Sequence, residues 1–502
     1  MWKSDKLNSL VCICLIVAVW PVLAVSSAPL LEHLGDFSFF VGTADFFSQK
    51  VFAVAGFLDY LCLFLNQLLF YPWLAALLLT ALLVAVYFLS VRFFGIDKRY
   101  SSIALVPVAL LLATVTGYGN HLFLLENTNV FYSATIGFLM SLCIAECIMR
   151  CNGFICKLIA LSVAGTVGYL LFGVYALFGL ILFVCKTASN GYSDRKVLVL
   201  CLVALLIVAL LPIFFNYRYF AGLDLMDFVA NKNCNVLPYI LLAVVSVALC
   251  FIQVKCHMGY ALALVCLLFL CGGGKEFRTE INMHSALEKE NWNKVLSLYS
   301  NYSDYCIKRN DRKYSALQQQ LEKVKRQDRI GMLEEFYKND YKTPNRAMAQ
   351  FRLIALMRTG KVGDELLNSL EGILDRRDDS YSTRLSYVYG AELMNNWGLF
   401  NCAYVLSESY RVHAGVNYYN LKESAKALLL AGDYRLASKY LMVLASTDRY
   451  GEWAKQHLDY IQSGKLSEEG RSRYNYELSL AVQRDDVFLQ KERVEKILMD
   501  AF

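Results

Sequence analysis

Charged residues are scarce in the first half of this 502-residue sequence. Residues 1–274 contain only 14 of the 49 Lys and Arg residues and 11 of the 43 Asp and Glu residues. The whole chain is 57% hydrophobic, its mean hydropathy is +0.40, and its apolar residues are grouped in long runs. This scarcity of charge excludes an ordinary soluble globule for the first half and predicts a membrane protein.

The sequence also lacks a strong excess of positive charge. Its formal net charge of +6 is divided equally between residues 1–274 and 275–502. No region therefore has the basic character of a nucleic-acid-binding surface, and we expect no DNA or RNA partner.

Several enzyme motifs are missing as well. No P-loop, dinucleotide-binding fingerprint, HExxH or GxSxG motif occurs in a suitable context. The segment Gly272-Gly273-Gly274-Lys275 lacks the spacing of a phosphate-binding loop and follows an apolar run instead of a strand. We interpret it as a linker.

Cysteine is frequent only in the first half, which holds 14 of the 16 residues. Cys143, Cys147 and Cys151 repeat every four residues along one helix face, but no His or second Cys pair is placed to complete a tetrahedral metal site. We interpret them as small apolar packing residues. The remaining two, Cys306 and Cys402, neither demand nor exclude an oxidising compartment.

Apolar runs long enough to cross a bilayer follow one another through residues 1–271. The predicted spans are 7–31, 73–94, 102–122, 130–149, 197–215, 236–254 and a shorter last run, 258–271. The first run could instead be a signal peptide with a cleavage-like stretch at residues 24–28. We favour an uncleaved first span because more spans follow it.

Two segments are ambiguous. Residues 32–71 mix acidic and aromatic residues, and we expect an interfacial or re-entrant segment there, because a span at 51–71 would work against the positive-inside bias. Residues 158–185 are interrupted by four glycines and fit either one long tilted span or two short helices that form a hairpin. The positive-inside count is tied between these alternatives, with a slight preference for the hairpin, which places the C-terminal half outside the cytoplasm.

The second half, residues 276–502, reads as amphipathic helices with an internal repeat of 34 residues. The pairs at this offset are Ala391/Ala425, Leu393/Ala427, Gly398/Gly432, Phe400/Tyr434 and Ala403/Ala437. This period, with a small residue at the turn and an aromatic residue two positions later, resembles tetratricopeptide repeats. The resemblance implies paired helices, with the aromatic residue filling the gap between neighbouring pairs. An irregular helical bundle is the alternative.

The predicted fold is therefore all-α. It comprises a multi-pass transmembrane domain at residues 1–271, a glycine linker at 272–275, and a tetratricopeptide-like helical-repeat domain at 276–502.

Acidic residues after the first span are the candidates for chemistry. Glu32, Asp36 and Asp45 lie among aromatic residues in a segment predicted to sit at the membrane surface. A carboxylate there could activate a hydroxyl acceptor or hold a divalent cation beside a phosphate. His121 and Glu126, in a polar loop on the same side, could orient that phosphate. Interfacial acids without a chemical role are the alternative reading.

This layout of a first span, an acidic outer loop, further spans and a soluble tail resembles membrane glycosyltransferases of the GT-C superfamily. The resemblance implies that Glu32, Asp36 or Asp45 acts as base or metal ligand toward a polyprenyl-linked sugar donor, although the Asp-bearing motifs of that family are not clearly matched. The Asn66–Pro72 run and the Glu290-Asn291-Trp292 turn are also similar to an uncharacterised family of bacterial inner-membrane proteins with tetratricopeptide-like tails.

We therefore expect a multi-pass protein of the bacterial inner membrane with a periplasmic C-terminal domain. Its partners would be the lipid bilayer, a polyprenyl-linked glycan and a protein bound by the repeats. Two functions remain open: sugar transfer, and a non-catalytic scaffold whose repeats recruit a partner. A transporter is disfavoured, because the spans carry few buried charges and no clear inverted repeat.

Overall fold

The computed structural model describes residues 2–116, 128, 130–190, 195–215, 218–220, 223–224, 236–252, 258–271, 274–321, 326–361 and 380–463. Within these ranges the chain is all-α, as predicted, apart from a short antiparallel pair, β1 (Arg218–Phe220) and β2 (Leu223–Asp224). The chain divides into two compact units, Met1–Gly274 (unit 1) and Lys275–Phe502 (unit 2).

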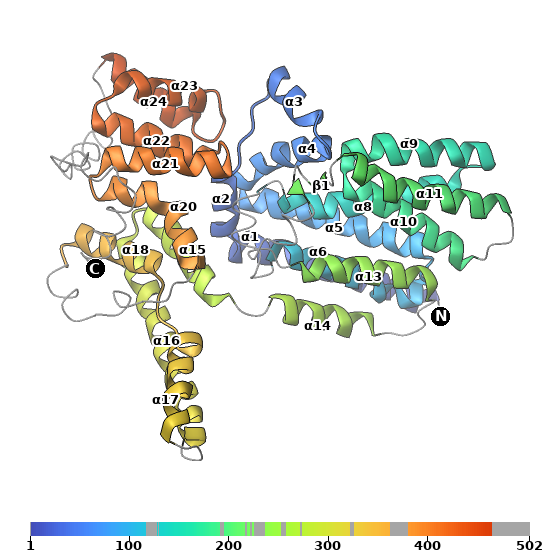
Figure 1. Ribbon diagram of the computed structural model, residues 1–502, viewed down its shortest axis with the longest axis horizontal. Helices are drawn as coiled ribbons and strands as arrows, with labels where there is room; N and C mark the ends of the chain where they lie inside the picture. The colour runs from blue at the N-terminus through green and yellow to red at the C-terminus, as the bar shows by residue number, and fades with distance from the viewer. Residues whose placement is uncertain are drawn as a thin grey trace. The chain divides into compact units, whose positions relative to one another are not determined.

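Unit 1 is a bundle of long apolar helices joined by shorter ones (Figure 1). Its long helices are α1 (Trp2–Ser26), α5 (Pro72–Phe94), α6 (Leu105–Thr116), α8 (Val130–Arg150), α9 (Phe154–Phe172), α10 (Val174–Ser189), α11 (Arg195–Phe214), α13 (Leu237–Phe251) and α14 (Gly259–Cys271). The short elements are α2 (Ala28–Asp36), α3 (Ala44–Val51), α4 (Gly56–Asn66) and the 3-10 helices η1 (Gln67–Phe70) and η2 (Lys98–Ala104).

Six segments within the described ranges are helical, long and apolar enough to cross a membrane. They are Asn8–Ser26, Pro72–Phe94, Lys98–Thr116, Phe131–Arg150, Phe154–Phe172 and Arg195–Phe214. Shorter apolar helices occupy Val174–Ser189, Leu237–Phe251 and Gly259–Leu268. Unit 1 is thus a membrane-spanning unit, in agreement with its composition.

Two predicted boundaries need correction. The first span ends at Ser26 instead of residue 31, because the chain bends at Ser27 and α2 begins as a separate helix with Pro29 in its first turn. The segment at 51–71 is not one helix: α4 and η1 follow α3 as separate short elements. The helix predicted at 102–122 is described as far as Thr116, and its predicted end lies outside the described residues.

The glycine-rich segment 158–185 contains two helices, so the hairpin alternative is the correct one. The break lies at Gly173, whose φ of 58° and ψ of −134° suit only glycine. The two helices then pack against each other and against α11. The first of them, α9, is longer than expected and spans 19 residues.

Glycines also allow α8 and α10 to approach closely. A Cβ atom on Gly137 would lie 2.2 Å from the ring of Tyr175, and one on Gly179 would lie 2.8 Å from the carbonyl oxygen of Ser141. The Ser141 hydroxyl donates a hydrogen bond of 2.6 Å to the Tyr175 carbonyl across the same contact. Small residues and interhelical hydrogen bonds are the usual means of helix association in lipid.

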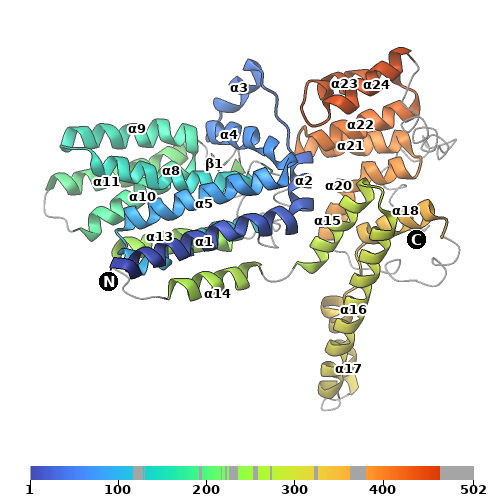
Figure 2. The same cartoon turned by 180° about the vertical axis from the view of Figure 1, so that it is seen from behind.

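Unit 2 consists of helices paired in antiparallel hairpins (Figures 1 and 2). Its elements are α15 (Lys275–Glu288), α16 (Trp292–Leu321), α17 (Arg326–Glu335), the π-helical turn η3 (Phe336–Asp340), α18 (Arg346–Thr359), α20 (Ser380–Asn396), α21 (Phe400–Ala414), α22 (Tyr418–Ala431), α23 (Tyr434–Ala445) and α24 (Gly451–Ser463). The sequence also predicts helices at 468–482 and 485–499, which lie outside the described residues.

The 34-residue offset superposes two consecutive hairpins, α20–α21 and α22–α23. Gly398 and Gly432 occupy the two turns with φ values of 76° and 84°, and Ala403 and Ala437 are fully buried in the following helices. The aromatic position behaves differently in the two copies. Phe400 is buried as predicted, but Tyr434 is 40% exposed, so it does not fill a gap between neighbouring pairs.

Candidate functional site

Contacts between helix ends define two ends of the bundle in unit 1. At one end, Lys186 Nζ donates to the carbonyl of Phe94 at 3.1 Å, and Asn8 Nδ2 donates to the carbonyl of Arg99 at 2.9 Å. Arg92 and Arg150 meet Glu146 there at 3.3 and 2.9 Å. The start of α1, the ends of α5, α8 and α10, and the start of η2 therefore lie together, and we call this the basic end.

The other end holds the end of α1 and the starts of α5 and α8. Trp20 Nε1 donates to the carbonyl of Trp73 at 2.9 Å, and the Tyr132 hydroxyl donates to the carbonyl of Ala75 at 3.3 Å. The short helices α2, α3 and α4 belong to this end and carry Glu32, Asp36, Asp45 and Asp59. We call it the acidic end.

The predicted catalytic acids occupy different settings at the acidic end. Asp36 ends α2 and is only 2% exposed, whereas Glu32, one turn earlier, is half-buried. Asp45 lies in the first turn of α3, which Thr43 caps by accepting from the Phe46 amide at 3.3 Å, and it is exposed. Asp36 is therefore the acid whose position is fixed most firmly by packing.

Helices α3 and α4 meet through aromatic side chains, and we call this pair of helices the aromatic cover. Lys50 and Asp59 pair across them at 3.6 Å. The Tyr60 ring packs against Phe40 and Phe47 with ring centroids 5.3 and 4.9 Å apart. Aromatic rings of this kind are typical of the zone where the bilayer meets water.

A further polar residue is buried at the acidic end. Asn66, the last residue of α4, is fully buried, and its amide donates to the carbonyl of Thr128 at 2.9 Å. Its Oδ1 accepts no hydrogen bond from the described residues. Helix α2 packs against η1, which follows Asn66 directly.

The remaining site predictions concern the substrate-binding residues and a divalent cation. His121 and Glu126, the predicted substrate-binding residues, lie outside the described residues. No group of three His, Cys, Asp or Glu side chains that could hold a metal ion occurs in the described ranges. The participation of a divalent cation stays a prediction.

Unit 2 contains a buried polar network that the sequence did not reveal. Nε2 of His284 in α15 lies 2.7 Å from Oε2 of Glu392 in α20, and the Tyr419 hydroxyl of α22 donates to the same oxygen at 2.9 Å. One turn before His284, the fully buried Glu280 accepts from Asn345 Nδ2 at 2.6 Å. The four-residue spacing of Glu276, Glu280, His284 and Glu288 was the available signal.

The surroundings shift the pKa values of these acids in opposite directions. Burial raises the pKa of Glu280 to about 8 and the nearby Glu276 adds to the rise, while the hydrogen bond from Asn345 and the neighbouring His284 oppose it. Burial also acts to raise the pKa of Glu392, but the adjacent His284, with help from Lys422 and the Tyr419 hydroxyl, lowers it below its ordinary value. Glu280 is thus held as a neutral acid and Glu392 as a carboxylate.

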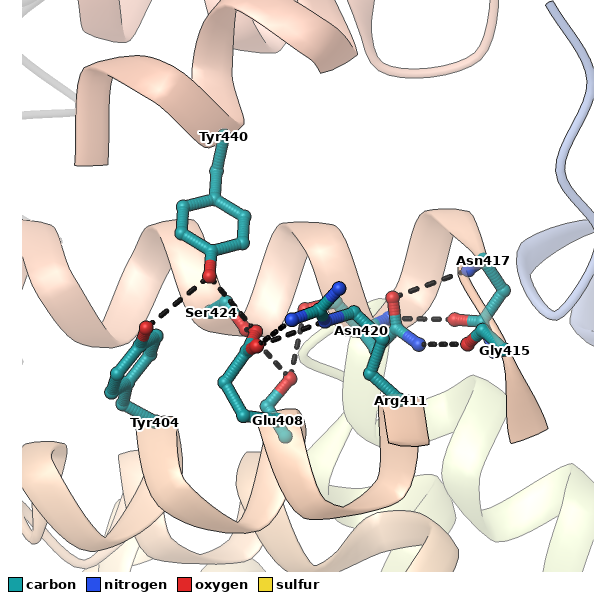
Figure 3. Close-up of polar contacts among 9 residues, drawn as sticks. Tyr404, Glu408, Arg411, Gly415, Asn417, Asn420, Ser424 and Tyr440 are labelled. Carbon is teal, nitrogen blue, oxygen red and sulfur yellow. Dashed lines mark hydrogen bonds and ion pairs between the residues drawn. The ribbon is translucent and has the colours of Figure 1, made fainter. Parts of the chain in front are cut away.

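A second network joins α21, α22 and α23 (Figure 3). Glu408 Oε1 accepts from the Tyr440 hydroxyl at 2.9 Å and from the Ser424 hydroxyl at 3.2 Å, and its other oxygen accepts from Arg411 Nε at 2.9 Å. The Tyr404 and Tyr440 hydroxyls are 3.3 Å apart. Because one carboxylate receives donors from three helices, this network is a clasp between the two repeat hairpins.

Comparison with known proteins gives one match. No curated protein and no solved structure matches the chain. A family model described as a family of unknown function, DUF6057, matches residues 4–502, which is almost the entire sequence. The chain belongs to this family, DUF6057.

Proposed function

We propose that the protein transfers a sugar or glycan from a polyprenyl-phosphate carrier, and that this reaction takes place at the acidic end of unit 1. The observation that carries the proposal is the burial of Asp36 at this end. Burying a carboxyl group costs free energy, so an acid held inside a membrane protein is by default a candidate for function.

The chemistry follows from the position of Asp36. Beside a lipid headgroup, a carboxylate fixed by packing can remove the proton of an acceptor hydroxyl as that oxygen attacks the sugar carbon, while the phosphate carrier leaves. The aromatic cover of α3 and α4 suits the apolar chain of such a carrier. Exposed Asp45 is less suited, because water competes for it.

We further propose that the acidic end faces away from the cytoplasm of a bacterial inner membrane. Arg92, Lys98, Arg99, Arg150 and Lys186 lie at the basic end, and basic residues favour the cytoplasmic side. The last span, α14, starts at the basic end, where the Tyr260 hydroxyl donates to Asn8 and a Cβ atom on Gly259 would lie 2.2 Å from the Ser102 carbonyl carbon. The chain therefore leaves unit 1 at the acidic end, which supports a periplasmic unit 2.

Asp36→Asn tests the catalytic proposal, with Asp45→Asn as the matched control. In a strain that depends on the protein for a measurable surface glycan, we expect Asp36→Asn to lower product formation by about 10²-fold or more, as loss of a general base does. Asp45→Asn should retain most of the product. Protein abundance in the membrane and the thermal unfolding midpoint in detergent check that both variants fold.

Full glycan production by a stably folded Asp36→Asn variant would exclude this acid as the base. The non-catalytic scaffold would then be the better proposal. One observation favours that alternative: apolar side chains of α21 and α23 are exposed in unit 2, namely Val405, Val412, Met442 and Val443. Exposed large apolar side chains on a helical domain are candidates for a protein interaction surface.

A further inference from the structure

Helix α5 has a single exposed stripe that runs along its whole length. Its exposed side chains are spaced four or seven residues apart and therefore share one face of the helix. They are Trp73, Leu77, Ala81, Phe88 and Arg92. Because α5 is apolar and long enough to cross a membrane, the apolar part of this stripe lies against lipid chains. We call it the α5 stripe.

The last residue of the α5 stripe is held by an acid of the neighbouring helix α8, which packs against α5. Arg92 Nε lies 3.3 Å from Glu146 Oε1. Arg150, one turn after Glu146 on α8, places Nε and Nη2 each 2.9 Å from the same oxygen. Three nitrogen atoms on one oxygen fix two guanidinium groups side by side. We call Arg92, Glu146 and Arg150 the arginine clamp.

The arginine clamp is accessible from outside the protein. The side chains of Arg92 and Arg150 are 60% and 55% exposed, whereas that of Glu146 is 22% exposed. A guanidinium group carries five N–H donors, and the contacts with Glu146 use one on Arg92 and two on Arg150. Two arginines and one glutamate have a net charge of +1. The clamp therefore suits an anion with one negative charge and more than one acceptor oxygen.

The place of the clamp decides which anion fits best. Arginine binds phosphate groups through paired N–H donors, and basic residues between membrane helices bind the headgroups of anionic lipids. Phe88, which is 53% exposed, lies one turn before Arg92 on the lipid-facing stripe. A phospholipid has a phosphodiester for the arginines and an acyl chain for the stripe. Inorganic phosphate presents similar oxygens but has no apolar part, so the lipid is the better match.

We propose that the arginine clamp and the adjoining α5 stripe form a binding site for an anionic phospholipid. Its phosphodiester accepts hydrogen bonds from Arg92 and Arg150, and one acyl chain lies along Phe88. Glu146 positions the two guanidinium groups and limits their net charge to that of one phosphodiester. This site lies at the basic end of unit 1 and does not depend on sugar transfer at the acidic end.

Binding of phosphatidylglycerol to the full chain tests the proposal. The chain is captured on beads in an uncharged detergent and titrated with phosphatidylglycerol that carries a fluorophore on its acyl chain, and the retained lipid is measured. We expect it to bind about 10-fold more tightly than phosphatidylcholine with the same label, whose headgroup has no net charge. The variant Arg92→Gln/Arg150→Gln should bind phosphatidylglycerol about 10-fold or more weakly than the wild type, because it lacks the charged donors.

The matched control is Lys98→Gln/Arg99→Gln, which removes two exposed positive charges from the same end but leaves the clamp in place. It should retain the affinity of the wild type. Equal losses in the two double variants would show diffuse attraction instead of a site, and equal binding of the two lipids would also overturn the proposal. Displacement of the lipid by equimolar inorganic phosphate would overturn the assignment to a phospholipid.

A single substitution keeps the test decisive where the double variant is unstable. If Arg92→Gln/Arg150→Gln lacks a cooperative thermal transition, Arg92→Gln replaces it, because the pair of Arg150 with Glu146 then remains. Lys98→Gln becomes its control. A smaller loss of affinity for phosphatidylglycerol is the expected result, and no loss overturns the proposal.

Discussion

At the scale of single residues, unit 2 shows how neighbours decide the charge of a buried acid. Glu392 has His284 beside it, and this contact holds the pKa of Glu392 low. Glu280 accepts from the amide of Asn345, and burial raises its pKa to about 8. Burial likewise raises the pKa of Glu423, which accepts from Asn395 Nδ2 at 2.8 Å. Glu280 and Glu392 therefore differ in charge at neutral pH, because burial dominates at Glu280 and the adjacent His284 dominates at Glu392.

Glu280 makes the stability of unit 2 depend on pH. In the unfolded chain a glutamate loses its proton near pH 4.3, whereas in the folded chain Glu280 keeps it up to about pH 8. Between these values the unfolded state binds fewer protons, so stability falls as the pH rises, by on the order of 1 kcal/mol per pH unit. Glu280→Gln, which cannot ionise and can still accept from Asn345, should remove this fall.

The measurement is the thermal unfolding midpoint of the full chain in detergent from pH 5 to pH 9. We expect the advantage of Glu280→Gln over the wild type to grow up to about pH 8 and then level off. Glu334→Gln, at an exposed position on α17, is the control and should follow the wild type. Parallel curves for Glu280→Gln and the wild type would show that Glu280 is ionised in the folded chain.

At the scale of helices and hairpins, local sequence signals predicted the elements better than their boundaries. The turn glycines Gly398 and Gly432 and the buried Ala403 and Ala437 were all visible as a 34-residue offset. The exposure of Tyr434 was not visible, because it depends on which helix covers the start of α23. The division at Gly173 was one of two alternatives, since four glycines in one apolar run do not show which of them adopts a positive φ.

The candidate sites also have features that the sequence predicted and features that it did not. The position of Asp36, Asp45 and Glu32 after the first span was a linear feature and could be read directly. Their different burial could not, because it arises from the packing of α2 against η1 and α5. The network joins His284 to Glu392, 108 positions later, and Glu392 to Tyr419, 27 positions later. The four-residue spacing of polar residues on α15 marks one side of this network but does not show which residues they contact.

The clasp centred on Glu408 predicts how the repeat hairpins hold together. Glu408→Ala removes the carboxylate that accepts from Tyr440 and Ser424, leaving Tyr440 the more distant Tyr404 hydroxyl and Ser424 the Ser407 hydroxyl. Loss of a partner in a partly buried network costs about 1–3 kcal/mol. We expect a lower thermal midpoint and faster amide hydrogen exchange in α23 than in α15. Lys439→Ala, at an exposed position on α23, should change neither. Unchanged exchange in the Glu408→Ala variant would mean that apolar packing alone holds α23.

At the scale of the whole molecule, the sequence could not settle on which side of the membrane the chain emerges. The side of the C-terminal half depends on whether residues 158–185 cross the membrane once or twice. The positive-inside count was the same for both alternatives, so it did not decide between them. Contacts between helix ends give the relative directions of α1, α5, α10 and α14: Lys186 meets Phe94, Asn8 meets Arg99, and Tyr260 meets Asn8. Local composition gives no signal for contacts between residues so far apart in the sequence.

The directions of these helices lead to a prediction about membrane topology. The chain passes Asn190 at the basic end and leaves α14 at the acidic end, so a reporter fused after Asn190 and one fused after Phe502 should lie on opposite sides. With the basic end in the cytoplasm, alkaline phosphatase should be active after Phe502 and inactive after Asn190, and green fluorescent protein should show the reverse pattern. Two reporters on the same side would contradict the directions of α11, α13 and α14, which follow Asn190. Opposite sides with the reverse assignment would contradict the hairpin at Gly173 or place the acidic end in the cytoplasm, and either result removes the likeness to transfer from an outward-facing lipid carrier.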